Sequence, residues 1–265
     1  MHVDGKLALV TGASSGIGRA AALELVSRGA DVIVVARRAE PLGTLRDEIE
    51  RGGRRCHVIL ADLSVEAECQ RAAEDALAIG PVDILVNNAG FAIFDEIASA
   101  RIEDLESMMM TNYFGALRLS RALLPSMIAR RSGAIVNIAS IAGIMGFFRM
   151  GGYCASKFAL VGLSEALRDE VYGSGVRVSL VCPGTVETEF FQLAEKGKMP
   201  SASRLVLAIP PQRAARAIAR AVERGSYRIV VPWTASIFMK FKELFPRTAH
   251  FLMRNVSAAI ERKTN

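Results

Sequence analysis

The sequence predicts an α/β fold: a doubly wound parallel sheet of about seven strands with helices on both faces. Two observations indicate it. Short apolar runs of strand length alternate with longer helical patterns along the chain, as expected for strands buried between two helical layers. Glycines and polar residues recur where the expected strands end, at the edge where open α/β sheets bind ligands.

The expected elements follow one another without a shift in composition that would mark a second globular domain. The strands are expected at residues 7–10, 31–36, 56–60, 82–86, 133–139, 176–181 and 227–231. The helices are expected at residues 19–28, 65–78, 102–130, 152–172 and 212–224. We therefore divide the chain into a catalytic domain, residues 1–232, and a C-terminal amphipathic helical extension, residues 233–265.

Composition narrows the class of protein. With 265 residues, 51% of them apolar and 23% charged, the chain can bury a sizeable core and is typical of a globular protein. No apolar run follows the basic start, so we expect no secretory signal. The longest uncharged stretch, 132–148, contains polar residues and glycines, so we expect no membrane span there. Four scattered cysteines suit a reducing cytoplasm, and three scattered histidines predict no metal site.

The net charge of +6 raises nucleic acid and anionic membranes as partners. After residue 232 the chain carries six Lys or Arg against two Glu, a net of +4. We expect a solvated helical face there and no nucleic-acid partner, because no basic stripe with interleaved aromatics occurs.

The first expected strand ends in a glycine-rich turn with Gly12, Gly16 and Gly18, followed by a helix. Glycines allow a pyrophosphate to approach the backbone, and the helix N-terminus offers unpaired N–H groups to it. Ser14, Ser15 and Ile17 belong to the same segment. This arrangement predicts a Rossmann-type dinucleotide site, although a tight structural turn is the alternative.

Arg37 and Arg38 follow the second expected strand, where such folds meet the adenosine ribose. An acidic residue there binds the 2′-hydroxyl of NAD, whereas an arginine pairs with the 2′-phosphate of NADP. We therefore expect NADP(H) in preference to NAD(H), with a surface arginine pair as the alternative.

Tyr153 and Lys157 are four residues apart, so both project from one face of the expected helix. A nearby ammonium favours the phenolate, and a tyrosine tuned in this way can exchange a proton with a carbonyl or alcohol oxygen. The pair alone is equally consistent with two side chains on an exposed helix.

Together these motifs resemble the short-chain dehydrogenase/reductase family, from about residue 5 to residue 231. The ordered set that carries the resemblance is Thr11-Gly12-x-x-x-Gly16-x-Gly18, Asp62, Asn87-Asn88-Ala89-Gly90, Asn112, Ser140, Tyr153-x-x-x-Lys157 and Pro183-Gly184. The resemblance implies that Tyr153 is the acid or base, that Lys157 lowers its pKa and holds the nicotinamide ribose, and that Ser140 binds the substrate oxygen. Asn112 would lie at a helix distortion and hold a relay water.

The resemblance also implies a cofactor-binding set. Besides the residues of the turn and the arginines, it comprises Asp62, Leu63, Asn88, Ala89, Gly90, Tyr153, Lys157, Pro183, Gly184, Val186 and Thr188. Asp62 as a helix cap is the alternative for that residue.

For the substrate we expect an apolar pocket, because two loops near the site are rich in aromatics and methionines. Its candidates are Ser140, Met145, Phe147, Phe148, Phe190 and Phe191. The expected activity is NADP(H)-dependent interconversion of an apolar ketone or aldehyde and its alcohol. A 3-oxoacyl thioester reductase and, in another class, a non-catalytic NADP(H)-binding sensor are the alternatives.

The resemblance implies a homodimer or homotetramer, paired through the helices that carry Asn112 and Tyr153. In the extension, Ala249, Leu252, Val256 and Ile260 recur at helical spacing. This pattern predicts a cap over the substrate mouth, a subunit contact or a peripheral membrane contact. We favour the first two, because an apolar stripe usually meets protein.

Overall fold

The computed structural model describes residues 1–188, 190, 208–249, 251–252 and 255. Its centre is a seven-stranded sheet in the order β3-β2-β1-β4-β5-β6-β7. Neighbouring strands are parallel at every step. The predicted doubly wound α/β fold is confirmed, as is its strand number.

All seven predicted strands occur within about two residues of their expected bounds. They are β1 Leu7–Thr11, β2 Asp31–Ala36, β3 Cys56–Leu60, β4 Ile84–Asn87, β5 Gly133–Ile138, β6 Val176–Pro183 and β7 Arg228–Val231. The helices are α1 Gly16–Ser27, α2 Ala39–Arg51, α3 Glu66–Ile79, α4 Ile102–Met109, α5 Ala116–Ala129, α6 Gly151–Glu170, α7 Pro211–Arg224 and α8 Thr234–Leu244.

Two helices differ from expectation. We assigned no element to the segment that forms α2. Pro41 and Gly43 lower its helix propensity, but Leu42, Leu45 and Ile49 form a buried stripe that stabilises it. Helix α1 begins at Gly16 and not at residue 19, so the second half of the glycine-rich turn is already its first turn. The N-terminus of α1 therefore lies directly at the end of β1.

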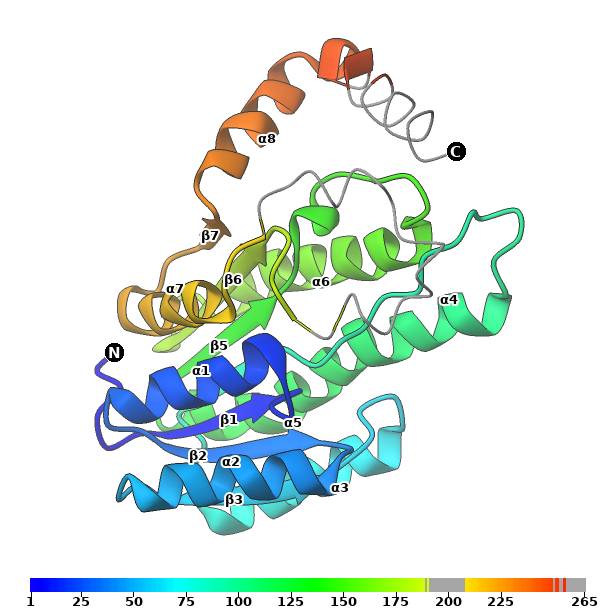
Figure 1. Ribbon diagram of the computed structural model, residues 1–265. Coiled ribbons are helices and arrows are strands. Elements are labelled where there is room, and N and C mark those ends of the chain that lie inside the picture. Colours follow the sequence, from blue (N-terminus) through cyan, green and yellow to red (C-terminus); the bar gives the residue numbers. More distant parts are fainter. Residues whose placement is uncertain (189, 191–207, 250, 253–254, 256–265) are drawn as a thin grey trace.

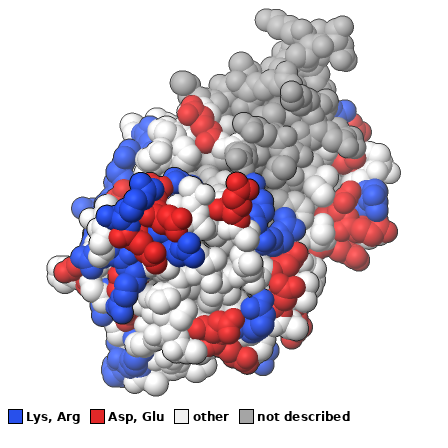
Figure 2. Space-filling model, turned by 60° about the horizontal axis from the view of Figure 1, so that its bottom comes forward, with Lys and Arg blue, Asp and Glu red and all other residues white. Residues whose placement is uncertain are grey.

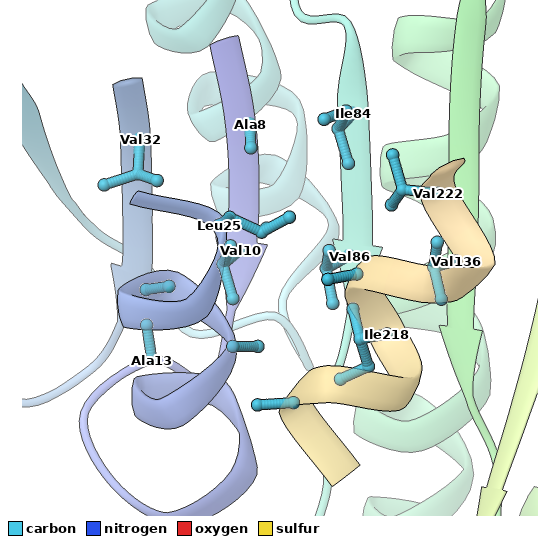
Figure 3. Packing of buried hydrophobic residues seen from close by; sticks show 14 of the residues in the cluster. Ala8, Val10, Ala13, Leu25, Val32, Ile84, Val86, Val136, Ile218 and Val222 are labelled. Atoms are coloured by element: carbon cyan, nitrogen blue, oxygen red, sulfur yellow. The ribbon is translucent and has the colours of Figure 1, made fainter. Parts of the chain in front are cut away.

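The sheet is covered on both faces (Figure 1). Helices α1, α2 and α7 pack on one face through a cluster that includes Leu25, Val86 and Ile218 (Figure 3). Helices α3, α5 and α6 pack on the other face through a second cluster that includes Leu119 and Leu167. Strands buried on both sides read as continuous apolar runs, which explains why their bounds were visible in the sequence.

Strand order reverses at β1, because the chain runs outward through β2 and β3 and then returns to place β4 beside β1. Ligands bind at such a switch point, in the crevice beyond the carboxyl ends of the strands. Hydrogen bonds join the carboxyl ends of β1 and β4 there. The backbone N–H groups of Asn88 and Ala89 both donate to Thr11 Oγ1, each at 2.9 Å.

On the face shown in Figure 2, basic and acidic side chains are interspersed. The ion pairs of the described residues include Arg46 with Asp47 at 2.7 Å on α2 and Arg71 with Asp75 at 3.2 Å on α3. At the other end of the chain, α8 rises from the end of β7 and extends away from the sheet (Figure 1). Within the described part of the chain, no helix combines the length and apolarity needed to cross a bilayer.

Candidate active site

The first turns of α6 bring Tyr153 and Lys157 to the carboxyl end of β5. Both side chains are buried. Lys157 Nζ lies 5.8 Å from the centroid of the Tyr153 ring and donates a hydrogen bond to the carbonyl oxygen of Ile138 at 2.9 Å. The pair predicted from its spacing therefore lies together at the edge of the sheet where ligands bind.

Burial dominates the electrostatics of this pair. It raises the pKa of Tyr153 above its usual value, while a hydrogen bond with Ser140 acts in the opposite direction. It also lowers the pKa of Lys157 to about 8. Desolvation of the buried hydroxyl is the largest influence on the tyrosine pKa, so the lowering of that pKa by Lys157 stays a prediction.

Ser140 joins the ends of two neighbouring strands. Its Oγ accepts a hydrogen bond from the backbone N–H of Ala142 at 3.1 Å and donates to the carbonyl oxygen of Pro183 at 3.4 Å. The first bond caps the short 3₁₀ turn Ile141–Gly143. Ser140 is thereby fixed beside the Tyr153 hydroxyl, with which it also hydrogen-bonds.

Asn112 lies in a π-helical turn, Met110–Gly115, between α4 and α5. The distortion that the resemblance implied is present. The Asn112 side chain accepts from Phe91 N and donates to Phe91 O, both at 2.9 Å, and it donates to Ser156 Oγ at 2.9 Å.

Gly90 shows how tightly this corner is built. A Cβ at that position would lie 2.8 Å from Asn112 Oδ1 and 3.3 Å from Lys157 Nζ. The amide of Asn112 and the ammonium of Lys157 therefore border the same small space, which only glycine leaves open.

The glycine-rich turn has the backbone geometry that glycine permits. Gly12 and Gly16 have φ values of 65° and 56°. A Cβ at Gly18 would lie 2.3 Å from the Gly12 carbonyl oxygen, so a larger residue would push the first turn of α1 away from β1. Ile17, between Gly16 and Gly18, packs against the core.

A groove of about 910 Å³ opens at the N-terminus of α1. Ser14, Ser15, Gly16, Arg19 and Thr188 are among the residues that line it. Ser15 is the N-cap residue, yet its side chain makes no capping bond. The helix N-terminus and the two hydroxyls suit a pyrophosphate. Glu24 and Glu187 also line the groove, and the Arg19 guanidinium is paired with Glu48.

The residues expected at the adenosine end lie together beyond β2 and β3. Arg37 is 71% exposed, and its guanidinium lies 3.5 Å from an Asp62 carboxylate oxygen. Arg38 donates to Ser14 Oγ at 3.2 Å. Asp62 also accepts hydrogen bonds from the N–H and hydroxyl of Ser64, at 2.9 and 2.7 Å. Burial alone would raise the pKa of Asp62, but the bonds from Ser64 and the charge of Arg37 together lower it.

Asp62 therefore forms a turn ahead of α3 and pairs with Arg37, but it is not the N-cap of α3, which is Val65. Its role in cofactor binding stays a prediction. Leu63 next to it is buried in the core on the α3 side of the sheet. Asn88 donates to Thr11 O at 2.9 Å, which orders the strand end beside the glycine-rich turn.

The segment after β6 runs alongside α1. The N–H of Gly184 donates to Val231 O at 2.7 Å, and Val186 is buried and bridged to Ile209. A Cβ at Gly16 would lie 3.0 Å from Thr188 Cγ2. Thr188 therefore faces the N-terminus of α1, while Val186 belongs to the core.

An apolar cluster surrounds Tyr153. Its buried members include Phe94, Met108 and Cys154, and Phe147 and Phe190 pack against them. The Phe190 ring meets the Tyr153 ring edge-on at 5.6 Å. Met145 is also buried, although it lies outside this cluster.

Phe148, another predicted pocket residue, is not part of this cluster. Phe148 is 47% exposed, and the Arg149 guanidinium lies 5.2 Å from its ring centroid. Arg149 has a φ of 58° and its side chain is held by Glu96 at 2.9 Å. Phe191 falls outside the described residues.

Sequence reasoning missed several residues of this site. Ser156 binds Asn112, and Phe91, Phe94 and Met108 contribute to the apolar cluster. Thr11 was part of the quoted motif, but its bond to Asn88 was not foreseen. One signal was available: the apolar run 91–94 follows the Asn-Asn-Ala-Gly segment at the end of β4. Met108 carried no such signal, because only the fold of α4 against α6 brings it to Tyr153.

Known proteins share this architecture. The family profile described as short chain dehydrogenase matches residues 6–198. The ketoacyl reductase HetN of Nostoc sp. is 35% identical over 228 residues, covering 86% of this chain and 78% of HetN.

Two solved structures are similar as well. A short-chain dehydrogenase/reductase from Burkholderia phymatum in complex with NAD has a TM-score of 0.84 at 26% identity, covering 92% of this chain and 94% of its own. A putative NAD(P)-dependent gluconate 5-dehydrogenase from Beutenbergia cavernae with bound NADP has a TM-score of 0.77 at 32% identity, covering 88% and 98%. The chain thus belongs to the short-chain dehydrogenase/reductase family and is an oxidoreductase that acts on carbonyl and alcohol groups.

Proposed function

We propose that this protein is an NADP(H)-dependent oxidoreductase in which Tyr153 exchanges the proton with the substrate oxygen. The observation that carries the proposal is the convergence of Ser140, Tyr153 and Lys157 at the carboxyl end of β5, on the sheet edge where β1 leads into the glycine-rich turn. Such a buried acid beside a hydroxyl donor suits carbonyl chemistry, in which negative charge develops on oxygen.

The cofactor residues follow the length of a dinucleotide. Ser14, Ser15 and the α1 N-terminus bind the pyrophosphate, and Arg37 and Arg38 bind the adenosine 2′-phosphate. Two exposed guanidiniums beyond β2 support NADP(H) over NAD(H), since an arginine pairs with phosphate through charge-assisted hydrogen bonds. When bound, the nicotinamide supplies or accepts the hydride.

The chain's own residues handle the proton. Ser140 Oγ and Tyr153 Oη hydrogen-bond the substrate oxygen; in reduction Tyr153 gives it a proton, and in oxidation Tyr153 takes one. Lys157, with a pKa of about 8, stays protonated at neutral pH and favours the transient phenolate. To Asn112, which borders the same space as Lys157, we assign a water that returns the proton from solvent.

For the substrate we propose an apolar ketone, aldehyde or the matching alcohol. The support is the cluster of Phe94, Met108, Phe147 and Phe190 around Tyr153, which offers aromatic and thioether surface and few polar groups. A 3-oxoacyl thioester is the second candidate, because the relative HetN is named a ketoacyl reductase.

We further propose a homodimer or homotetramer that pairs through the outer face of α6, where Phe158 is exposed. The four cysteines are free and buried, which supports a reducing, cytoplasmic location.

The test is consumption of NADPH, with NADH as the control, across a carbonyl panel. The panel holds a 3-oxoacyl thioester, a steroid ketone, a long-chain aldehyde and a small polar ketone. We expect turnover of an apolar member with NADPH. Turnover of the polar ketone alone would overturn the substrate class, and a preference for NADH would overturn the cofactor assignment.

A further inference from the structure

Helix α8 turns its apolar side to solvent. Trp233, just before the helix, is 65% exposed; Ile237 and Leu244 are 59% and 74% exposed. Spacings of four and seven residues place all three on one helical face. A surface helix of a globular protein normally exposes its polar face and buries its apolar face. The exposed apolar face of α8 therefore suits contact with another apolar surface.

The other side of α8 already has a partner. Met239 is its one buried residue, and Lys242 Nζ donates to the carbonyl oxygen of Ile144 at 3.2 Å, in the loop that follows Ser140. The apolar face of Trp233, Ile237 and Leu244, which we call the outer face, is therefore the side of α8 that is turned away from the body.

Basic side chains flank the outer face. Lys240 lies between Ile237 and Leu244 and is exposed, as is Arg247 just beyond the helix; one exposed acidic residue, Glu243, lies between them in the sequence. The chain carries +6 and its last 33 residues carry +4, which leaves +2 for the first 232. Two thirds of the net charge thus belongs to about one eighth of the chain. That pattern complements an anionic apolar surface.

We propose that the outer face of α8 docks on a lipid bilayer with anionic headgroups, with Trp233, Ile237 and Leu244 inserted at the interface. Tryptophan and aliphatic side chains on one face with lysine and arginine beside them are typical of helices that lie in a membrane surface. A second copy of the chain fits less well, because a two-fold contact would bring Lys240 and Arg247 towards their own copies. The inference is independent of the substrate proposed above.

The chain offers a built-in probe, because Trp233 is its single tryptophan. Full-length protein is mixed with vesicles of phosphatidylcholine alone, or of equal parts phosphatidylglycerol and phosphatidylcholine, and flotation and tryptophan emission are measured. We expect flotation and a blue shift with the anionic vesicles, both reduced by high salt. No flotation and no shift with either vesicle would overturn the proposal.

Variants locate the contact. Ile237→Ser with Leu244→Ser should weaken vesicle binding about tenfold or more, since exposed apolar area drives insertion. Lys240→Gln with Arg247→Gln should weaken it about 30-fold on anionic vesicles, about fivefold for each charge. The charge-matched control, Arg46→Gln with Arg101→Gln on the body, should bind like the wild type.

Two results would contradict the proposed site. Equal losses in the control and in the α8 charge variant would point to net charge and not to this face. Emission that is already blue-shifted without vesicles and that moves to longer wavelength on dilution would show that Trp233 is buried by a second copy, and the bilayer proposal would fail.

Discussion

The Nζ atom of Lys157 donates a hydrogen bond to the carbonyl oxygen of Ile138 at 2.9 Å, which holds a buried ammonium at the last residue of β5. This position costs stability. Burial lowers the pKa of Lys157 to about 8, whereas a lysine in an unfolded chain titrates near ~10.4. The penalty is therefore fully present at neutral pH and is relieved as the pH rises through about 8.

Lys157→Met removes this titration and gives a direct measurement of the penalty. Between pH ~7 and ~9.5, the unfolding free energy of the wild type should rise relative to that of the variant by about 2 kcal/mol. Urea denaturation of both proteins across this range measures the difference. If the two curves remain parallel, Lys157 titrates in the folded protein as it does in the unfolded chain.

Tyr153→Phe removes the proposed acid but keeps the ring that packs against Phe190. We expect NADPH binding and stability close to those of the wild type, with kcat/KM lower by about 10²–10⁴-fold, the usual contribution of general acid catalysis. The matched control is Tyr172→Phe, because Tyr172 is 93% exposed. A Tyr153→Phe enzyme that keeps most of its turnover would rule out the proton role.

Arg37→Asp tests the cofactor assignment. The new carboxylate would repel both the 2′-phosphate and Asp62, which now lies 3.5 Å from the Arg37 guanidinium, and it could accept from the 2′-hydroxyl of NAD(H). Loss of a charged hydrogen bond should lower the NADPH to NADH preference by about 10- to 100-fold. The ratio of kcat/KM values for the two cofactors is the measurement. An unchanged ratio, with a shift in Arg38→Asp instead, would assign the phosphate to Arg38.

Much of the fold was predictable, because parallel strands buried on both faces are continuous apolar runs bounded by polar turns. Helix α2 was not, since Pro41 and Gly43 argue against a helix locally. Packing of Leu42, Leu45 and Ile49 on the sheet overrides that propensity. Tertiary burial decided the outcome at this segment.

The candidate catalytic residues were visible because the chemistry needs them at short, regular spacing on one helix or at strand ends. The residues of the substrate pocket were harder to predict from the sequence. Phe148 looked like pocket lining, yet Arg149 adopts a left-handed backbone, and Phe148 lies under its guanidinium, which Glu96 holds. Phe94 and Met108 reach Tyr153 only through the packing of α4 and α6, which no local pattern specifies.

The proposed subunit contact can be tested at Gly162, four residues after the exposed Phe158 on α6. A Cβ at Gly162 meets no atom within 4 Å in the single chain, and the same holds for Gly43 on α2. Leucine at either position should therefore be tolerated by the fold, and its helix propensity exceeds that of glycine by up to about 1 kcal/mol. A partner helix packed on α6 would meet the new side chain.

We accordingly expect Gly162→Leu to weaken the oligomer while Gly43→Leu leaves it intact, with both variants folded. Sedimentation velocity over a dilution series measures the assembly, and thermal unfolding verifies the fold. If both variants keep the wild-type mass at every concentration, the subunits pair through some other face. If only the Gly162→Leu oligomer dissociates, α6 is the contact. The single chain has room for the leucine, so the clash would have to come from a neighbouring subunit.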